Sequence, residues 1–270
     1  MKSKKKRVRE ITDYIKFVFP MLILYILFFI LPLFQTIGYS FTDYNGINPK
    51  KEFTGLTNYF DVFQDKWFYN SMAFTGKSVL LMILLANVLG FLLALALNTK
   101  IRSRNILRAI VFCPFVFNNV TVGFIWQFLL GRFMTDLYPL TGWKVFNIGW
   151  LSDNSLVLYS VVFVKLWQSI GYFMVIYLAG LQLLPQDPLE AAVIDGCTGI
   201  KMIRYITIPL MKPTAFVCIF LAITESLNMF PLIMSLTNGG PGHASENISL
   251  YIYNEAFKSH RMGYASALAV

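Results

Sequence analysis

Apolar residues run along this chain in long segments that polar stretches separate. Five runs lie at about 15–38, 74–98, 106–130, 156–183 and 213–236, and each exceeds the roughly 18 apolar residues that cross a bilayer. A further run begins near Gly263 but is too short to span a hydrocarbon core about 30 Å thick. Because the runs are continuous rather than alternating, they argue against a β-barrel. The pattern predicts an all-α, polytopic transmembrane helical bundle with five full spans and the start of a sixth.

The composition supports a membrane protein, and the charge distribution predicts its orientation. Hydrophobic residues make up 56% of the chain and charged residues 14%, against about 25% charged in soluble domains. The net charge of +9 could suggest nucleic acid, but six basic residues stand together before the first run. The segments on the same side as residues 1–14 hold 14 of the 23 Lys and Arg residues. This bias predicts a basic cytoplasmic N-terminus at 1–14, a transmembrane domain at 15–270 and no nucleic-acid partner.

The sequence offers no chemistry for catalysis. It contains no phosphate-binding loop of the Walker type, so the chain cannot hydrolyse a nucleotide itself. It has no His/Cys cluster with metal-ligand spacing, and its two histidines both lie in the last outer segment. We therefore expect a protein that is not an enzyme and that holds no metal or cofactor of its own.

The inner segment at about 184–212 carries an unusually complete set of helix signals. Asp187 suits an N-cap, and Glu190 follows three residues later, where its side chain can reach back to the N–H of the cap. Gly196 permits the left-handed turn that ends a helix. A second short helix is expected from about 199 to 206, and Pro209 opposes a simple continuation into the next span. The prediction is two short helices with a glycine hinge at the membrane surface.

The same loop carries a family motif. Its Glu-Ala-Ala triplet is followed by Asp-Gly, then by nine residues and Ile-x-Ile-Pro, with Ile208 where Leu is usual. This pattern resembles the "EAA" loop of binding-protein-dependent ABC importer permeases. The residues that match it, or that the resemblance places in the loop, are Glu190, Ala191, Ala192, Asp195, Gly196, Arg204, Ile206 and Pro209.

Flanking motifs resemble the carbohydrate-uptake branch of these permeases, more narrowly the maltose/multiple-sugar permease (MalF) type. They are Ser40-Phe-Thr-Asp-Tyr, Gly55-Leu-Thr-Asn-Tyr, Leu236-Thr-Asn-Gly-Gly-Pro-Gly and Gly263-Tyr-Ala-Ser-Ala. The resemblance implies a bacterial or archaeal cell-membrane importer with a sister permease subunit, two ATPase subunits and an extracellular solute-binding protein. ATP and Mg would bind the ATPase subunits, and the loop would couple their closure to the spans.

Polar side chains inside the predicted spans are candidates for a substrate path. Charged groups there are costly, and they usually face a cavity or a partner. Sugars need hydrogen-bonding groups together with aromatic surfaces, so we name as candidates Glu225, Asn228, Gln168, Trp167, Asn118 and Asn119. Other interpretations stay open: the amides could join helices, and Lys165 could snorkel toward the outer surface or pair with a helix of another subunit.

Two other functions compete with the sugar importer. Within the same superfamily, the substrate could be an amino acid, a peptide or a polyol. In a different class, the chain could be a secondary transporter driven by an ion gradient, with Glu225 as its proton carrier. That second hypothesis predicts transport without ATPase partners and gives the loop at 184–212 no reason for its helix signals.

Overall fold

The structure, a computed structural model, describes residues 15–99 and 102–270. The predicted basic N-terminus at 1–14 lies outside these residues. Regular structure in the described ranges is helical, apart from one isolated bridge between Thr42 and Phe53. Three helices are long and apolar enough to cross a membrane: Ile15–Ser40, α4 (Lys66–Leu97) and α8 (Val157–Gln182). Two bent helix pairs raise the number of candidate spans to as many as five. The helical membrane fold is confirmed, while the exact number of spans stays a prediction.

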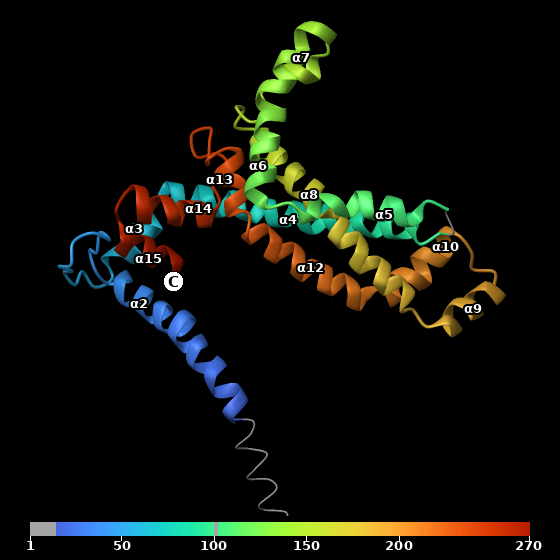
Figure 1. Cartoon of the computed structure of the whole chain (residues 1–270), viewed down its shortest axis with the longest axis horizontal. Coiled ribbons are helices and arrows are strands. Elements are labelled where there is room, and N and C mark those ends of the chain that lie inside the picture. The colour runs from blue at the N-terminus through green and yellow to red at the C-terminus, as the bar shows by residue number, and fades with distance from the viewer. Residues whose placement is uncertain (1–14, 100–101) are drawn as a thin grey trace, which may run out of the picture. The chain divides into compact units, whose positions relative to one another are not determined.

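The chain forms two compact units, and the smaller one joins both ends of the described chain. It contains the residues up to Asp65 together with Ile252–Val270. Its elements are the helix Ile15–Ser40, which includes η1 (Ile26–Ile30) and α2 (Leu31–Ser40), then α3 (Thr57–Gln64), η6 (Asn254–Lys258) and α15 (Met262–Ala269). Helix α15 packs against α2 and α3 (Figure 1). The predicted start of a sixth span corresponds to α15.

The larger unit, Lys66–Tyr251, is built around α4, α8 and α12 (Lys212–Leu227), which pack against one another. Helix α5 (Arg104–Phe112) lies along α8. Glycines allow these helices to approach closely: a Cβ at Gly171 would lie 2.2 Å from the carbonyl oxygen of Val111, and one at Gly90 would lie 2.8 Å from Cβ of Phe173. Small residues at contacts are typical of helices that pack inside a membrane.

Two of the predicted spans are not continuous helices. The run at 106–130 breaks after η2 (Cys113–Val116), and the helices Arg104–Val116 and Asn119–Thr141 meet at 94°. Pro114 and the extended backbone of Phe117 interrupt the helix there. The run at 213–236 breaks between α12 and α13 (Phe230–Leu236), where Pro231 starts the new helix. Each of these two predicted runs therefore contains a break, and whether each counts as one span stays a prediction.

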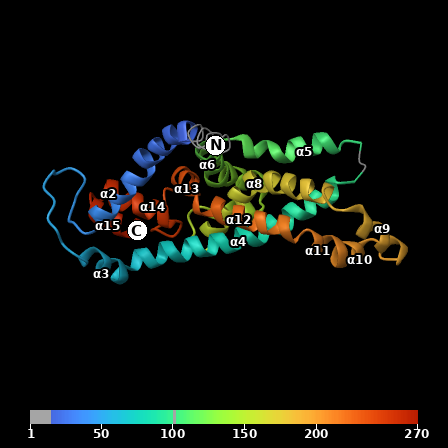
Figure 2. The same ribbon diagram turned by 90° about the horizontal axis from the view of Figure 1, so that it is seen from below.

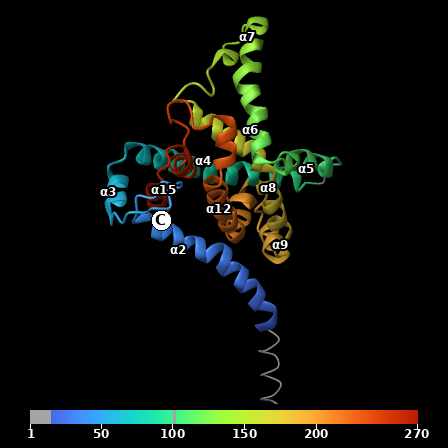
Figure 3. The same cartoon turned by 60° about the vertical axis from the view of Figure 1, so that its left-hand side comes forward.

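The remaining elements of the larger unit extend from these helices or connect them. Beyond the first break, one helical segment extends away from α8 and α12 (Figure 3). It consists of α6 (Asn119–Gln127), η3 (Phe128–Phe133) and α7 (Met134–Thr141). Helix α13 packs against α6. The short elements η4 (Lys144–Asn147) and α14 (Ile248–Tyr253) complete the connections. At the C-terminal end of α8 lie α9 (Gln186–Ile194), α10 (Ile200–Met202), η5 (Ile203–Thr207) and α11 (Ile208–Leu210) (Figure 2).

Candidate functional site

The loop at 184–212 does fold into two short helices, but the first one begins earlier than predicted. Helix α9 starts at Gln186, and its N-cap is Pro185, which makes no side-chain capping bond. Asp187 therefore lies inside the first turn, where its charge favours the N-terminal end of the helix dipole. Pro188 is also accommodated in this turn, because the first N–H groups of a helix have no partner within it. The predicted capping pair of Asp187 and Glu190 was wrong.

Gly196 ends α9 as predicted, in a left-handed turn. Its φ is +75°, a value that L side chains rarely adopt. The N–H of Gly196 donates to the carbonyl of Val193 at 3.0 Å, and the N–H of Cys197 donates to that of Ala192 at 2.8 Å. These two bonds make a Schellman motif, which satisfies the last carbonyls of the helix. Asp195 is the C-cap residue, so the Asp-Gly pair has a structural reason.

The second helix runs further than predicted, through Pro209 rather than stopping before it. The helical segment Ile200–Leu210 contains the wide turn η5, in which the N–H of Ile208 reaches the carbonyl of Ile203. A wide turn just before a proline relieves the clash of its ring with the preceding turn. The chain then bends by 70° at Met211 and enters α12. Pro209 therefore shapes the helix, and the bend follows two residues later.

Burial divides the side chains of the loop into an inner and an outer set. Ala192 is 6% exposed, and α9 contacts η5. Ile206 is half-buried, whereas Glu190, Ala191, Arg204 and Pro209 are exposed. Large apolar side chains are exposed as well, with Ile194 at 85% and Ile200 at 82%. An exposed surface of this kind, with charges beside it, is typical of an interaction site.

The intramembrane candidates gather around one ion pair. Lys165 on α8 is 3% exposed, and its Nζ lies 2.6 Å from Oε2 of Glu225 on α12, whose side chain is 28% exposed. The same Nζ donates to Oδ1 of Asn119 at 3.5 Å. A buried ammonium needs such partners, because an unpaired charge in a poorly hydrated site is costly. Three of the polar groups that the sequence placed in different spans therefore meet.

Two other candidates form hydrogen bonds with backbone groups at the break before α6. The Nε2 of Gln168 donates to the backbone oxygen of Phe117 at 2.9 Å, and Oδ1 of Asn118 accepts from the N–H of Val120 at 2.8 Å. Both bonds satisfy backbone groups that the break leaves without helical partners. Gln168 keeps one buried oxygen without a hydrogen-bond partner among the described residues.

The last two candidates stand at the edge of this cluster. Trp167 is partly exposed and meets the Trp126 ring edge-on, with the ring centroids 5.3 Å apart. The indole nitrogen of Trp126 is buried and finds no hydrogen-bond partner in the described part of the chain. Asn228 is the exposed C-cap of α12, and Glu225 lies within the last turn of the same helix. We name the group formed by Lys165, Glu225 and the five other predicted candidates the polar cluster.

Three of the four flanking motifs meet one another in the smaller unit. The Nδ2 of Asn58 donates to the backbone oxygens of Ser40 and Thr42, both at 2.9 Å. The N–H of Gly263 donates to the backbone oxygen of Tyr44 at 2.7 Å, and a Cβ on Gly263 would lie 2.0 Å from the oxygen of Thr42. These three motifs therefore hold one another. Sequence patterns alone did not reveal the pairing, because part of it joins residues 40–59 to residues 263–267 far along the chain.

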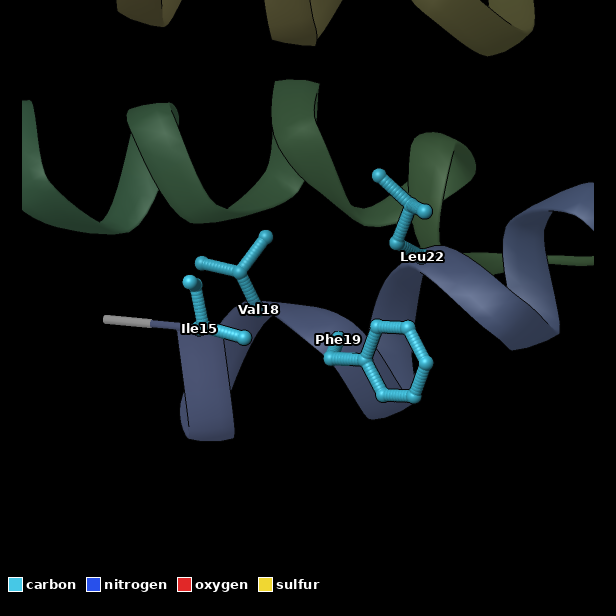
Figure 4. A pocket seen from close by; sticks show the side chains of 4 residues that line it. All are labelled: Ile15, Val18, Phe19 and Leu22. Atoms are coloured by element: carbon cyan, nitrogen blue, oxygen red, sulfur yellow. The ribbon is translucent and has the colours of Figure 1, made fainter. Parts of the chain in front are cut away.

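One further hollow lies on the first helix. The side chains of Ile15, Val18, Phe19 and Leu22 project from its first described turns and line the hollow (Figure 4). These four side chains supply only hydrocarbon. The surface suits lipid or another apolar helix and offers nothing for catalysis or for recognition of a polar ligand.

Comparison with known proteins identifies the class to which this fold and loop belong. Residues 86–270 match the family model "Binding-protein-dependent transport system inner membrane component". The chain belongs to this family, so it is an inner-membrane component of a binding-protein-dependent transport system, and the resemblance drawn from the loop is confirmed.

Named relatives align with nearly the whole chain. It is 36% identical to the probable starch degradation products transport system permease protein AmyD of Thermoanaerobacterium thermosulfurigenes, over all of this chain and 92% of AmyD. It is 33% identical to the multiple sugar-binding transport system permease protein MsmF of Streptococcus mutans, over 92% of this chain and 86% of MsmF. A chain of the bacterial alginate ABC transporter, solved with an alginate pentasaccharide-bound periplasmic protein, shares the fold. Its TM-score is 0.80 at 22% identity, over 98% of this chain and 90% of that one.

Proposed function

We propose that this chain is the permease subunit of an ATP-driven importer of sugars or oligosaccharides. A sister permease subunit would complete the translocation path, two ATPase subunits would bind ATP and Mg, and an extracellular binding protein would deliver the sugar. The observation that carries the proposal is the loop at 184–212, an exposed helix pair on a member of the binding-protein-dependent transport family. The named relatives, which include permeases for starch degradation products and multiple sugars, support the substrate class.

The loop would act as a coupling helix that docks into an ATPase subunit. Its exposed isoleucines, Ile194 and Ile200, offer apolar contacts, and Glu190 and Arg204 offer charges that fix the orientation of the partner. Two backbone hydrogen bonds span the bend at Met211: its N–H donates to the oxygen of Thr207, and its own oxygen accepts from the N–H of Ala215 in α12. Because these bonds join the loop to α12, a push on the loop would move α12 with it.

The polar cluster would line the translocation path against the sister subunit. Glu225, Asn118 and Asn228 keep part of their surface exposed in this chain, and Trp167 adds an aromatic face. Helix breaks beside buried polar groups are also found at transporter binding sites near the bilayer midplane. Glu225 lies 2.6 Å from the ammonium of Lys165, so its carboxylate already has a partner within this chain, and the importer needs no proton carrier there.

The orientation follows from the same proposal. The ATPase subunits lie in the cytoplasm, so the loop at 184–212 and the N-terminus would both be cytoplasmic. The excess of Lys and Arg on this side of the spans supports the assignment.

The test separates coupling from folding with two matched glycines. Gly196 and Gly142 both follow a helix in the left-handed conformation, at φ +75° and +68°, and a Cβ would meet nothing within 4 Å of either. Each N–H also donates to a carbonyl of its helix, to Val193 and Tyr138 respectively. Replacement by Pro therefore causes the same local damage at both places.

The four-subunit complex is reconstituted in liposomes with its binding protein, and ATP hydrolysis and labelled oligosaccharide uptake are measured. We expect Gly196→Pro to abolish uptake while the complex assembles, and Gly142→Pro to retain most of it. Glu190→Lys should also uncouple hydrolysis from uptake. Normal uptake by an assembled Gly196→Pro complex would refute the coupling role, and uptake without ATP or ATPase subunits would refute the importer.

A further inference from the structure

A second polar pocket lies in the larger unit, away from the polar cluster. Its volume is about 460 Å³, within the range of about 300–1,000 Å³ that is typical of small-molecule sites. Three segments that are far apart in the sequence line it: residues 67–77 of α4, residues 154–159 before and within the start of α8, and residues 242–244. We call it the outer pocket.

One face of α4 supplies the first wall. Trp67, Asn70, Phe74 and Lys77 follow one another at spacings of three, four and three residues, so they share a helix face. The Trp67 ring is partly exposed. None of the ion pairs found in the described part of the chain involves Lys77, so its ammonium is available to a ligand.

The second wall is held in place by Asp153. Its Oδ1 accepts from the N–H and the hydroxyl of Ser155 at 2.7 and 2.6 Å. The Ser155 hydroxyl and amide hydrogen bonds hold the pKa of Asp153 below its ordinary value, so the carboxylate stays charged and the turn stays ordered. Asn154 and the half-exposed Tyr159 ring face the pocket from this wall.

The third wall is the Gly-Gly-Pro-Gly turn, which side chains fasten to α4. The Nδ2 of Asn70 donates to the backbone oxygen of His243 at 2.8 Å, and the rings of His243 and Trp67 lie 4.4 Å apart. Nδ1 of His243 lies 2.5 Å from Oε2 of the buried Glu246. The turn is thus held rigidly, and the pocket is formed before any ligand binds.

The outer pocket and the coupling loop lie at opposite ends of this unit. The pocket lies at the N-terminal ends of α4 and α8, whereas the loop follows the C-terminal end of α8. Helix α4 has 32 residues and is therefore about 48 Å long, longer than a hydrocarbon core about 30 Å thick. Its first turns can therefore project beyond the membrane on the side opposite the loop.

We propose that the outer pocket is a saccharide-binding subsite, distinct from the polar cluster, that takes one sugar unit as it enters. Trp67 and Tyr159 would stack on the ring, and Asn154 and Lys77 would bond to its hydroxyl groups. The mixture of aromatic faces and hydrogen-bonding groups in a preformed hollow is the chemistry that a sugar requires. This inference rests on the proposed importer function, because the sugar must arrive at this face.

The test measures protection of a cysteine in the pocket. Asn154→Cys places a thiol in the wall, and Asn147→Cys places one in the same loop outside the lining. Maleimide labelling is followed on the assembled complex in nanodiscs without binding protein, and the parent chain corrects for its own three cysteines. The probe is maltotriose, or the oligosaccharide found in the uptake assay if maltotriose is not transported.

We expect millimolar sugar to slow labelling of Asn154→Cys and to leave Asn147→Cys unchanged. Adding Lys77→Gln should raise the concentration for half protection about ten-fold, or about 1.4 kcal/mol, whereas Lys66→Gln outside the pocket should not. No protection by a sugar that the complex transports would overturn the pocket and leave the importer intact. Protection only by loaded binding protein would also overturn it, because the pocket would then be a docking surface. Failure of ATP-driven uptake would refute the importer itself.

Discussion

The ion pair between Lys165 and Glu225 allows a sharp test of the polar cluster. Replacing Glu225 with Leu leaves the ammonium of Lys165 3% exposed, with only the Asn119 oxygen at 3.5 Å. Breaking a buried pair in this way costs about 3–5 kcal/mol. Lys165→Met leaves a carboxylate that is 28% exposed and can reach water, so we expect a smaller cost of about 1–2 kcal/mol.

The double replacement is the informative variant. Apolar side chains of similar volume often replace a buried ion pair with little loss of stability. We therefore expect Lys165→Met with Glu225→Leu to lie within about 1 kcal/mol of the native chain, although the two single costs add up to roughly 4–7 kcal/mol. The coupling between the two residues would then be at least about 3 kcal/mol.

Reversible unfolding in mixed detergent micelles gives the unfolding free energies of the native chain and the three variants. Additivity within about 0.5 kcal/mol would show that the two side chains do not interact, and would refute the pairing. Uptake by the double variant answers a separate question. A stable double variant without transport would place the charges in the substrate path, and normal transport would leave them a structural role.

Two further predictions concern a close helix contact at Gly171 and the hydrogen bonds of Asn58. Gly171→Ala places a methyl group against a backbone carbonyl of α5, so we expect a loss of about 1–3 kcal/mol in unfolding free energy and a lower melting temperature. The control is Gly131→Ala, whose Cβ would meet nothing within 4 Å, and it should melt like the native chain. Asn58→Ala removes both of its hydrogen bonds to backbone oxygens and should lower the unfolding free energy by about 1–3 kcal/mol. Asn48→Ala in an exposed turn should cost less than half of that. Equal losses would contradict the bridging role of Asn58.

The sequence predicted the elements that depend on local signals. Long apolar runs located α4 and α8, and the left-handed turn at Gly196 followed from Asp-Gly at the end of a helix. Asp187 was predicted as the N-cap of α9, whereas the helix begins at Gln186 and Pro185 occupies the N-cap position. Boundaries of this kind depend on which of two adjacent starts packs better, and spacing alone does not decide that.

The two broken spans show why hydropathy could not predict the rest. Only a few polar residues stand at each break, Asn118 and Asn119 at the first and Asn228 at the second, so the averaged hydropathy still looks like one helix. Pro114 and Pro231 stand at the interruptions, and the first break is tolerated because other side chains satisfy the freed backbone groups. For the first break these are Gln168, which lies 51 residues away from Phe117 in the sequence, and the local cap Asn118.

Polar side chains in a span can satisfy backbone groups as well as bind a substrate, so their presence alone does not identify a substrate site. Gln168 and Asn118 resemble the side chains that would bind a sugar, yet their observed bonds go to backbone ends. Glu225 resembles a proton carrier, yet it neutralises a buried ammonium. A site for sugar must therefore use groups that remain after these structural demands are met. In the larger unit such groups include the exposed Asn228 and the ammonium of Lys77 in the outer pocket, and variants at these two positions should separate transport from folding.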